Sequence, residues 1–361
     1  MKKVRVLISS PDLSSEVNVS GISSVVKTII NGLSEKVQFF HLKAGRPDKD
    51  VLGLFGYMQL LRTLLGFPFV VYFYRIDLFH QNVPLNFKGV IREYLFKNLA
   101  RMYGIPILVH LHGGDYLRQP PSSRILRYMI RSLLNGARKV LVLNNYEASQ
   151  TKRLYQINSL IMKNAVDEDF YSHVADRSMS DKVRFLFLGR LIEEKGLFEM
   201  INAFEILKET GKSFKLEICG SGPCEAEIVK RFTEVLGDDF EFKGVVSGVE
   251  KRDVIQSSDF FLLPSYFSEG LPMSLLEAMS CGVVPIVSDD ESMLQVIKDG
   301  SNGFIVQKRS VVDLAKTLGR MMFMEYDEYR KVSLACRKAV EVHYSMKNYS
   351  NSLLSIYEEI V

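Results

Sequence analysis

The chain has 361 residues, of which 47% are hydrophobic and 24% are charged. This is ordinary globular composition, and at this length it predicts two domains. No low-complexity tract or repeat is visible, so a disordered or repetitive architecture is excluded. The four cysteines lie in the second half without the pairing of metal ligands, which indicates buried thiols in a reducing compartment, by default the cytoplasm.

The charges are unevenly divided, although the net charge is only +4. Residues 1–163 hold 23 Lys and Arg against 9 Asp and Glu, a net +14, whereas residues 164–361 hold 23 against 33, a net −10. So basic a half indicates an anionic partner, either nucleic acid or an anionic membrane surface. An ordinary solvated surface is the alternative.

The first half alternates apolar strands with helical segments. MKKVRVLISSPD begins with basic residues, but its apolar run is broken by Arg5 and ended by Pro11, so it predicts a first strand at Val4–Ser9 rather than a signal peptide. A helix is expected from about Gly21 to Ser34. Further strands are expected at Phe69–Tyr74, Ile105–Leu111 and Lys139–Leu143. This βαβ order predicts a parallel sheet with crossover helices.

Two stretches of the first half are candidates for contact with a membrane surface. Residues 88–139 hold 10 Lys and Arg against two acidic residues, interleaved with apolar residues at helical spacing. Such basic amphipathic helices attract anionic lipid, although core-facing helices with a basic solvent side have the same pattern. Val51–Tyr74 is the most apolar stretch, but Arg62 at its middle and Pro68 argue against a spanning helix. Interfacial docking of this stretch stays open.

The second half repeats the alternation of strands and helices. Strands are expected at Val183–Leu188, Lys215–Cys219, Phe240–Phe242, Asp259–Leu263, Val283–Val287 and Gly303–Val306. Helices such as Leu197–Glu209 and Ala226–Leu236 fall between them. The chain is therefore expected to form two doubly wound, Rossmann-like α/β domains, 1–166 and 167–345, joined near the polar stretch Asp167–Asp181. In doubly wound sheets, ligands bind beyond the carboxyl ends of the strands.

Two motifs that follow strands of the second half are suited to a diphosphate. Arg190 and Lys195 stand between a strand and a helix, where a fixed pair of cations would stabilise a leaving diphosphate as its charge grows. Gly220-Ser221-Gly222 ends the next strand and is expected to be scaffold beside the ligand. In the absence of other motifs, a charged turn after a strand is more often a solvated loop than a ligand site.

Two glutamates lie eight positions apart at an expected helix start. Pro272 favours the first helical turn, and apolar residues follow it at helical spacing. Eight helical residues span about 12 Å, so Glu269 and Glu277 are too far apart to flank one bond as the carboxylates of a glycosidase do. They suit the two ends of one long ligand, such as a sugar nucleotide, although two solvated glutamates on an ordinary amphipathic helix have the same spacing.

Together these motifs resemble the signature of glycosyltransferase family 4, in which a Glu-x7-Glu run precedes a small-residue turn and a Val/Ile-rich strand. The resemblance implies a retaining transferase of the GT-B fold, with two domains facing across a cleft. It also implies that a C-terminal helix, 346–361, crosses back to the first domain.

The resemblance implies roles for residues of the second half. Arg190 and Lys195 would neutralise the leaving diphosphate, and Glu277 would hold the ribose. The groups that would hold hydroxyls of the donor sugar are Glu269, Gly270 and Leu271. Arg190, Lys195 and Glu269 are expected to be catalytic together with His112. No protein nucleophile is expected, because the leaving phosphate takes the acceptor proton in the front-face mechanism inferred for retaining members.

Three residues of the first half complete the implied site. Gly21 opens a helix after the first strand and would place backbone N–H groups near a phosphate; family members usually have two adjacent glycines where this chain has Ser20-Gly21. His112 follows an expected strand and would contact the donor sugar, and Asp115 would face the acceptor. Asn164-Ala165-Val166-Asp167 resembles the family's interdomain Asn-Gly-Val-Asp, with Ala in place of Gly.

The predicted function is transfer of a hexosyl group from a nucleoside-diphosphate sugar to a lipid-linked saccharide, specifically one carried by undecaprenyl diphosphate, in bacterial surface polysaccharide synthesis at the inner face of the cell membrane. The sequence contains neither metal-ligand spacing nor a P-loop motif, so metal independence is predicted, no cofactor is expected, and phosphoryl transfer on a P-loop is excluded as a leading interpretation. The alternatives are a GT-B-like nucleotide-sugar epimerase, a transferase with a soluble acceptor, and a basic nucleic-acid-binding module. The last leaves the second-half motifs unexplained.

Overall fold

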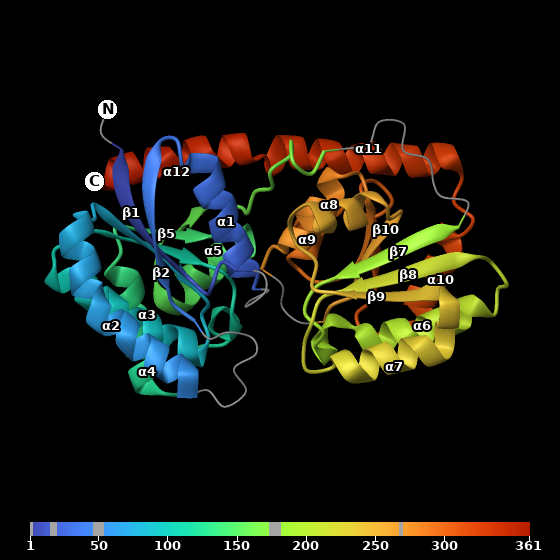
Figure 1. Cartoon of the computed structure of the whole chain (residues 1–361), viewed down its shortest axis with the longest axis horizontal. Helices are drawn as coiled ribbons and strands as arrows, with labels where there is room; N and C mark the ends of the chain where they lie inside the picture. Colours follow the sequence, from blue (N-terminus) through green and yellow to red (C-terminus); the bar gives the residue numbers. More distant parts are fainter. Residues whose placement is uncertain (1–2, 15–19, 46–53, 173–181, 267–269) are drawn as a thin grey trace. The chain divides into compact units, whose positions relative to one another are not determined.

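The computed structural model describes residues 3–14, 20–45, 54–172, 182–266 and 270–361. Two compact units make up the chain (Figure 1): unit 1 comprises Met1–Ala165 with Met346–Val361, and unit 2 comprises Val166–Ser345. Each unit is built around one parallel sheet with helices on both faces.

Unit 1 contains a six-stranded parallel sheet within its described residues. Its strands are β1 Val4–Ser10, β2 Val37–Lys43, β3 Leu78–Val83, β4 Ile107–Leu111, β5 Lys139–Val142 and β6 Leu160–Ile161. They lie in the order β2-β1-β3-β4-β5-β6, so the topological switch point falls between β1 and β3. The central strands are covered on both faces, and every residue of β3 and β4 is buried.

Helices cover both faces of the unit 1 sheet. Their bounds are α1 Gly21–Leu33, α2 Leu54–Tyr74, α3 Phe87–Met102, α4 Arg124–Asn135, α5 Asn145–Gln150 and α12 Met346–Ile360, with a 3-10 turn η1 at Asp115–Leu117 and a π-helical turn η2 at Thr151–Tyr155. α1 and α12 contact each other on one face, and α2, α3 and α4 lie side by side on the other (Figure 1). One apolar core, which includes Phe67 of α2, Phe96 of α3 and Ile130 of α4, joins these three helices to the sheet.

The segment predicted as a strand at Phe69–Tyr74 instead forms the last six residues of α2, so this prediction is wrong. Phe67 and Val71 are buried one helical turn apart, whereas Phe69 between them is 66% exposed, and a strand would place all three on one face. The aromatic and β-branched composition is typical of a strand, but burial of a helical face against the core outweighs it. Pro68 lies inside the helix. Among the described residues, no helix combines the length and hydropathy needed to cross a membrane.

Unit 2 contains a second six-stranded parallel sheet within its described residues. Its strands are β7 Val183–Leu188, β8 Phe214–Cys219, β9 Phe240–Gly244, β10 Phe260–Leu263, β11 Val284–Ser288 and β12 Phe304–Val306. The order β12-β11-β10-β7-β8-β9 puts the switch point between β7 and β10. Each strand lies within about two residues of a predicted strand, because buried parallel strands read as short apolar runs.

The helices of unit 2 also cover both faces of its sheet. Their bounds are α6 Leu197–Lys208, α7 Glu225–Leu236, α8 Gly248–Gln256, α9 Met273–Ser280, α10 Val311–Met321 and α11 Tyr326–His343, with 3-10 turns η3 Glu193–Lys195, η4 Gly237–Asp239 and η5 Met293–Gln295. α6 contacts α7 and α10 on one face, and α9 contacts α8 and α11 on the other (Figure 1). The prediction of two doubly wound α/β units is confirmed.

The last helix, α12, belongs to unit 1 although it follows unit 2 in the chain. Leu353 and Tyr357 are fully buried, and the Tyr357 hydroxyl lies 2.7 Å from Nδ1 of His80 in β3. Val166 and Ser345, the first and last residues of unit 2, form an isolated parallel bridge. The two points at which the chain passes between the units are therefore adjacent.

Two neighbouring phenylalanines test the orientation of α2. Phe67→Ala should lower the free energy of unfolding of unit 1 by about 3–5 kcal/mol, because it removes a fully buried ring from the core. Phe69→Ala removes a ring that is 66% exposed and should change that free energy by less than about 0.5 kcal/mol. Urea unfolding followed by far-UV circular dichroism measures both variants. Equal losses would contradict the helical assignment.

Candidate functional site

Two cationic side chains follow β7 at the switch point of unit 2. Arg190 is exposed, and Lys195 is half-buried at the end of η3, where Gly196 turns the chain into α6. Only glycine suits this turn, because its φ is +75° and a Cβ would lie 2.3 Å from the carbonyl oxygen of Pro264 after β10. Arg190 and Lys195 thus stand at the carboxyl edge of the sheet, where doubly wound domains bind ligands.

Backbone contacts with the loop after β8 hold the loop after β7. The Leu191 N–H donates to the Ser221 carbonyl at 2.9 Å. A Cβ at Gly222 would lie 2.3 Å from the Leu191 carbonyl oxygen, and a Cβ at Gly220 would lie 1.8 Å from the Gly189 carbonyl oxygen. A side chain at either glycine would separate the two loops. Both glycines are therefore needed to fix the position of the loop after β7, residues 189–196, which we call the cationic loop because it carries Arg190 and Lys195.

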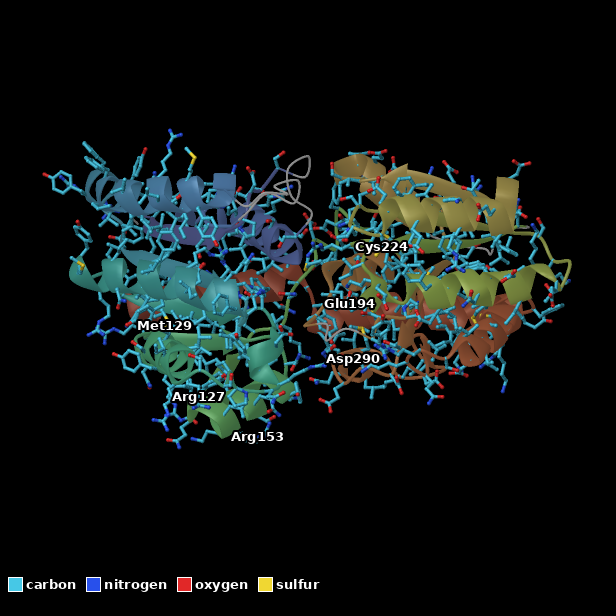
Figure 2. The ribbon with its side chains drawn as sticks, turned by 90° about the horizontal axis from the view of Figure 1, so that it is seen from below. Arg127, Met129, Arg153, Glu194, Cys224 and Asp290 are labelled. Atoms are coloured by element: carbon cyan, nitrogen blue, oxygen red, sulfur yellow. The ribbon has the colours of Figure 1, made fainter. Side chains whose placement is uncertain are left out.

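The cationic loop also contacts the segment after β10. The Tyr266 N–H donates to the Glu194 carbonyl at 2.9 Å, and the Ser265 hydroxyl donates to the same oxygen at 3.1 Å. Figure 2 shows Glu194, Cys224 and Asp290, which follow β7, β8 and β11, at one end of unit 2. Motifs far apart in the sequence are therefore neighbours at this edge of the sheet.

α9 follows β10 and begins at Met273, one residue later than predicted, with Pro272 as its N-cap and no side-chain hydrogen bond to its first N–H groups. Free N–H groups and the helix dipole favour an anion at this N-terminus. Gly270 is half-buried and Leu271 is buried just before the helix. Glu269, the first glutamate of the predicted pair, lies outside the described residues.

Glu277, the second glutamate of the pair, is buried on α9. Its Oε2 lies 2.5 Å from Nζ of Lys251 on α8. Burial first, and then the charge and hydrogen bond of Glu277, raise the pKa of Tyr171 far above its ordinary value. A ligand hydroxyl can reach this carboxylate only by sharing it with Lys251 and Tyr171, and no spacing in the sequence reveals these two partners.

Two more cations follow β12 at the same edge of unit 2. Lys308 Nζ pairs with Asp290 Oδ2 at 2.9 Å, and the Arg309 guanidinium lies 4.1 Å from the centroid of the Tyr266 ring. Burial alone would raise the pKa of Asp290, but hydrogen bonds from Ser292 and Lys308 outweigh it and lower that pKa. Lys308 and Arg309 were not predicted from the sequence, although the rule that ligands bind beyond strand ends applies to the turn after β12 as it does to the cationic loop.

The N-terminus of α1 in unit 1 carries the predicted Gly21. Ser20 caps this helix, and its hydroxyl accepts a hydrogen bond from the Ile22 N–H at 3.2 Å. Ser20 has φ −64° and ψ 136°, an extended conformation open to any residue, so serine in place of the family's glycine is unstrained here. Gly21 is exposed, and no described atom beyond its neighbours lies within 4 Å of an added Cβ.

His112 follows β4 and is oriented by Asn82, a buried residue of β3. The two side chains meet through His112 Nε2 and Asn82 Oδ1 at 2.7 Å. Asn82 Nδ2 donates to the Ser9 carbonyl at 2.9 Å, which assigns Oδ1 to the side facing His112. Nε2 must then carry the hydrogen, and Nδ1 is left as an acceptor. Sequence reasoning missed Asn82 because it lies inside a strand.

Three imidazoles form a row from the end of β4 towards α12. The ring of His110 lies 4.3 Å from that of His112 and 5.6 Å from that of His80, between centroids. Burial lowers the pKa of His110 to about 3, and burial together with the neighbouring imidazoles lowers the pKa of His112 well below its ordinary value. These rings are therefore neutral at pH 7. Within the described ranges, no group of three or more His, Cys, Asp or Glu is arranged to hold a metal ion.

Asp115 is exposed and begins η1 directly after Gly113 and Gly114, three residues beyond His112. Gly113 and Gly114 have φ of +71° and +120°, and a Cβ at Gly114 would lie 2.6 Å from the backbone of Leu85. The loop after β4 therefore lies directly against the loop after β3. This packing keeps His112 and Asp115 at the carboxyl edge of the unit 1 sheet.

Residues 173–338 match the family described as "Glycosyl transferases group 1". Unit 2 is therefore similar in sequence to a group 1 glycosyltransferase domain. Among relatives of the chain, the amylovoran biosynthesis glycosyltransferase AmsK of Erwinia amylovora is 30% identical over 189 residues, which are 51% of this chain and 46% of AmsK. The chain spans about half the length of the first curated relatives that it matches. The matched range includes Arg190, Lys195 and Glu277.

Solved structures share the fold of nearly the whole chain, beyond the range that matches the family. Sucrose-phosphate synthase from Thermosynechococcus elongatus has a TM-score of 0.81 over 99% of both chains at 16% identity. HepE of Anabaena in complex with UDP-glucose has a TM-score of 0.73 over 98% of this chain and 99% of HepE, at 13% identity. The GT-B fold class predicted from the sequence is thereby confirmed.

The close approach of the β7 and β8 loops can be tested with two glycines of unit 2. Gly222→Ala should lower the free energy of unfolding by about 1–3 kcal/mol, because its Cβ collides with the Leu191 carbonyl oxygen. Gly319 lies inside α10 with nothing within 4 Å of an added Cβ, so Gly319→Ala should raise that free energy by about 0.5–1 kcal/mol. Guanidinium unfolding compares the two. A Gly222→Ala variant as stable as the wild type would refute the contact.

The buried imidazoles should make unit 1 sensitive to mild acid. His110 has a pKa of about 3 in the folded chain against 6.5 ordinarily, so the unfolded chain binds a proton that the folded chain does not. Stability is therefore full above pH 6.5 and falls as the pH drops towards 3. Acidification from pH 6.5 to pH 5 should lower the free energy of unfolding by about 2 kcal/mol through this residue.

His110→Leu should remove that part of the pH dependence when urea unfolding at pH 7 is compared with unfolding at pH 5. His343→Gln, which removes an exposed imidazole at the end of α11, is the matched control and should follow the wild type. If His110→Leu loses as much stability on acidification as the wild type, His110 is not held neutral by burial.

Proposed function

We propose that the chain is a retaining glycosyltransferase of family 4, which transfers a hexosyl group from a nucleoside-diphosphate sugar to a hydroxyl of a lipid-linked saccharide in bacterial surface polysaccharide synthesis. The observation that carries the proposal is the contact between the cationic loop after β7 and the segment after β10, at the switch point of a group 1 domain. Two cations and a helix N-terminus at one strand edge are complementary to a diphosphate.

The proposed donor is bound mainly by residues of unit 2. Arg190 and Lys195 bind the diphosphate, and Glu277 binds the ribose while sharing its charge with Lys251. Hydroxyls of the sugar are bound by Glu269, Gly270 and Leu271. The complex of HepE with UDP-glucose supports this class of donor and leaves the sugar and the base open. The donor is a substrate, and no metal or other cofactor is assigned a role.

Residues of unit 1 contribute to the donor and acceptor in this proposal. The N–H groups at Gly21 bind a donor phosphate. His112 accepts a hydrogen bond from a hydroxyl of the donor sugar at Nδ1, the atom left unprotonated by its bond to Asn82. Asp115 faces the acceptor. Removal of Asn82 would leave His112 free to change tautomer, so Asn82 acts as a positioning residue.

The proposed reaction breaks the bond from the sugar C1 to the diphosphate oxygen and forms a bond from C1 to the acceptor oxygen on the same face. The acceptor proton passes to the leaving phosphate, so no residue serves as nucleophile. Arg190 and Lys195 stabilise the negative charge that develops on the diphosphate, and this lowers the barrier because the charge is larger in the transition state than in the bound donor. His112 and Glu269 act through contact with the sugar.

The proposed acceptor is a lipid-linked saccharide reached from the cytoplasmic face of the membrane. The net +14 of residues 1–163 supports an anionic membrane surface as partner, with the protein peripheral on its inner face. The name of AmsK, a transferase of amylovoran biosynthesis, supports a role in polysaccharide synthesis. The proposed setting is the synthesis of a capsule or a lipopolysaccharide. No nucleic acid is proposed as partner.

The donor class can be tested by thermal stabilisation with a panel of sugar nucleotides, since a ligand at 100 times its Kd adds about 2.7 kcal/mol. The best donor is then incubated with a lipid-linked saccharide, with the same saccharide freed of lipid, and alone. Transfer to the lipid-linked acceptor with retained configuration is expected. An epimer formed from donor alone would favour the epimerase, and equal use of the lipid-free saccharide would favour a soluble acceptor.

Lys195→Ala should lower kcat by about 100- to 1,000-fold, or about 3–4 kcal/mol, because it removes a cation from the leaving diphosphate. Lys230→Ala is the matched control, since Lys230 is a solvent-exposed lysine of α7 in the same unit, and its kcat should equal that of the wild type. Steady-state kinetics at saturating donor measure both variants. An unchanged kcat in Lys195→Ala would exclude the proposed role.

A further inference from the structure

Seven large apolar side chains project from the outer face of α2 in unit 1. Each is between 59% and 79% exposed, and together they form what we call the α2 stripe: Tyr57, Met58, Leu61, Leu65, Phe69, Tyr72 and Phe73. Most follow one another by three or four positions, so they run continuously along a helix of 21 residues, about 31 Å long. In Figure 2 side chains of α2 project away from the body of the unit.

The exposed stripe is not explained by a helix that fails to pack against the core. The opposite face of α2 is already buried, with Phe67 and Val71 in the core and Leu60 and Leu64 packed against it. α2 is therefore apolar on both faces, whereas a surface helix of a soluble protein is polar on the outer one. A contiguous apolar patch of this length on a monomer marks a contact surface.

The charges around the stripe are cationic. Arg62 is the one charged residue within α2, and Arg75 follows the helix; both are exposed. The neighbouring helices α3 and α4 add further exposed basic and apolar side chains to the same layer: Lys88, Arg101, Met102, Arg124, Ile125, Tyr128 and Arg131. Apolar and aromatic residues flanked by Arg and Lys are typical of helices that lie in the interface of an anionic membrane.

We propose that the α2 stripe inserts into the interface of an anionic lipid bilayer, with its apolar side chains at the boundary of headgroups and acyl chains and with Arg62 and Arg75 on lipid phosphates. The tyrosines suit this depth, because an apolar ring enters the lipid while the hydroxyl stays among the headgroups. This inference specifies which surface contacts the membrane in the proposed function. It rests on the proposed function only for its biological purpose.

Self-association is the other way to cover such a stripe, and the charges oppose it. A two-fold contact through α2 would bring together two copies of a region with a net charge of +14. An anionic membrane gains from the same charge. The membrane therefore accounts for both the apolar stripe and the basic layer around it, whereas a second copy accounts for the stripe alone.

A single tryptophan tests insertion directly, because the chain contains none. Phe69→Trp places the probe in the stripe, and Phe323→Trp, at a 62% exposed position of unit 2, is the matched control. With vesicles of phosphatidylcholine and phosphatidylglycerol, emission from Phe69→Trp should shift to shorter wavelength and be quenched by brominated lipid, and that from Phe323→Trp should not. Vesicles of phosphatidylcholine alone should give a weaker response. Unchanged emission from Phe69→Trp with the anionic vesicles would overturn the proposal.

Vesicle co-sedimentation supplies an independent measurement. Leu65→Ser with Phe69→Ser should lower binding to the anionic vesicles by about tenfold or more, whereas Val312→Ser with Phe323→Ser, equally exposed in unit 2, should bind as the wild type does. Equal binding by the stripe variant would overturn the proposal, as would a concentration-dependent dimer in sedimentation velocity that this variant abolishes. Since no donor is present, failure to bind vesicles is read separately from failure to transfer sugar.

Discussion

The arrangement of the loops at the carboxyl edge of the unit 2 sheet depends on close backbone contacts that leave no room for a side chain. Gly196 stands against the carbonyl of Pro264, and Gly222 stands against the carbonyl of Leu191. These approaches bring the turns after β7, β8 and β10 within hydrogen-bonding distance of one another. The cations of one strand end and the helix N-terminus of another are consequently held by main chain, so little reorganisation is needed when an anion arrives.

The candidate sites of the two units differ in their electrostatics. In unit 2 the polar groups at the strand ends are ionic, as in the pairs of Lys251 with Glu277 and Lys308 with Asp290. In unit 1 the groups behind His112 are neutral imidazoles and amides, because burial makes their charged forms costly. Ions suit a diphosphate, and fixed neutral donors and acceptors suit sugar hydroxyls, which agrees with the division of roles proposed between the units.

Burial explains which parts were predictable from the sequence. The unit 2 strands are short apolar runs, and Arg190, Lys195 and His112 were identified because they follow such runs. β3 was missed because it contains His80, Gln81 and Asn82 and yet is wholly buried, its polar groups bonded to partners remote in sequence. Lys251 and Tyr171 could not be predicted either, because their contacts with Glu277 join residues that are remote in sequence. α2 was misassigned in part because both of its faces are apolar, which hides the period that distinguishes a helix from a strand.

The position of α12 sets the order in which the chain can be completed during translation. Leu353 and Tyr357 leave the ribosome after the whole of unit 2, yet they cover part of one face of the sheet in unit 1. N-terminal domains generally fold first as a chain is synthesised, but here the part of that face beside α1 stays uncovered in the nascent unit 1 until residues 346–361 emerge. Unit 2 is contiguous in sequence and can fold earlier, so unit 1 begins before unit 2 and is completed after it.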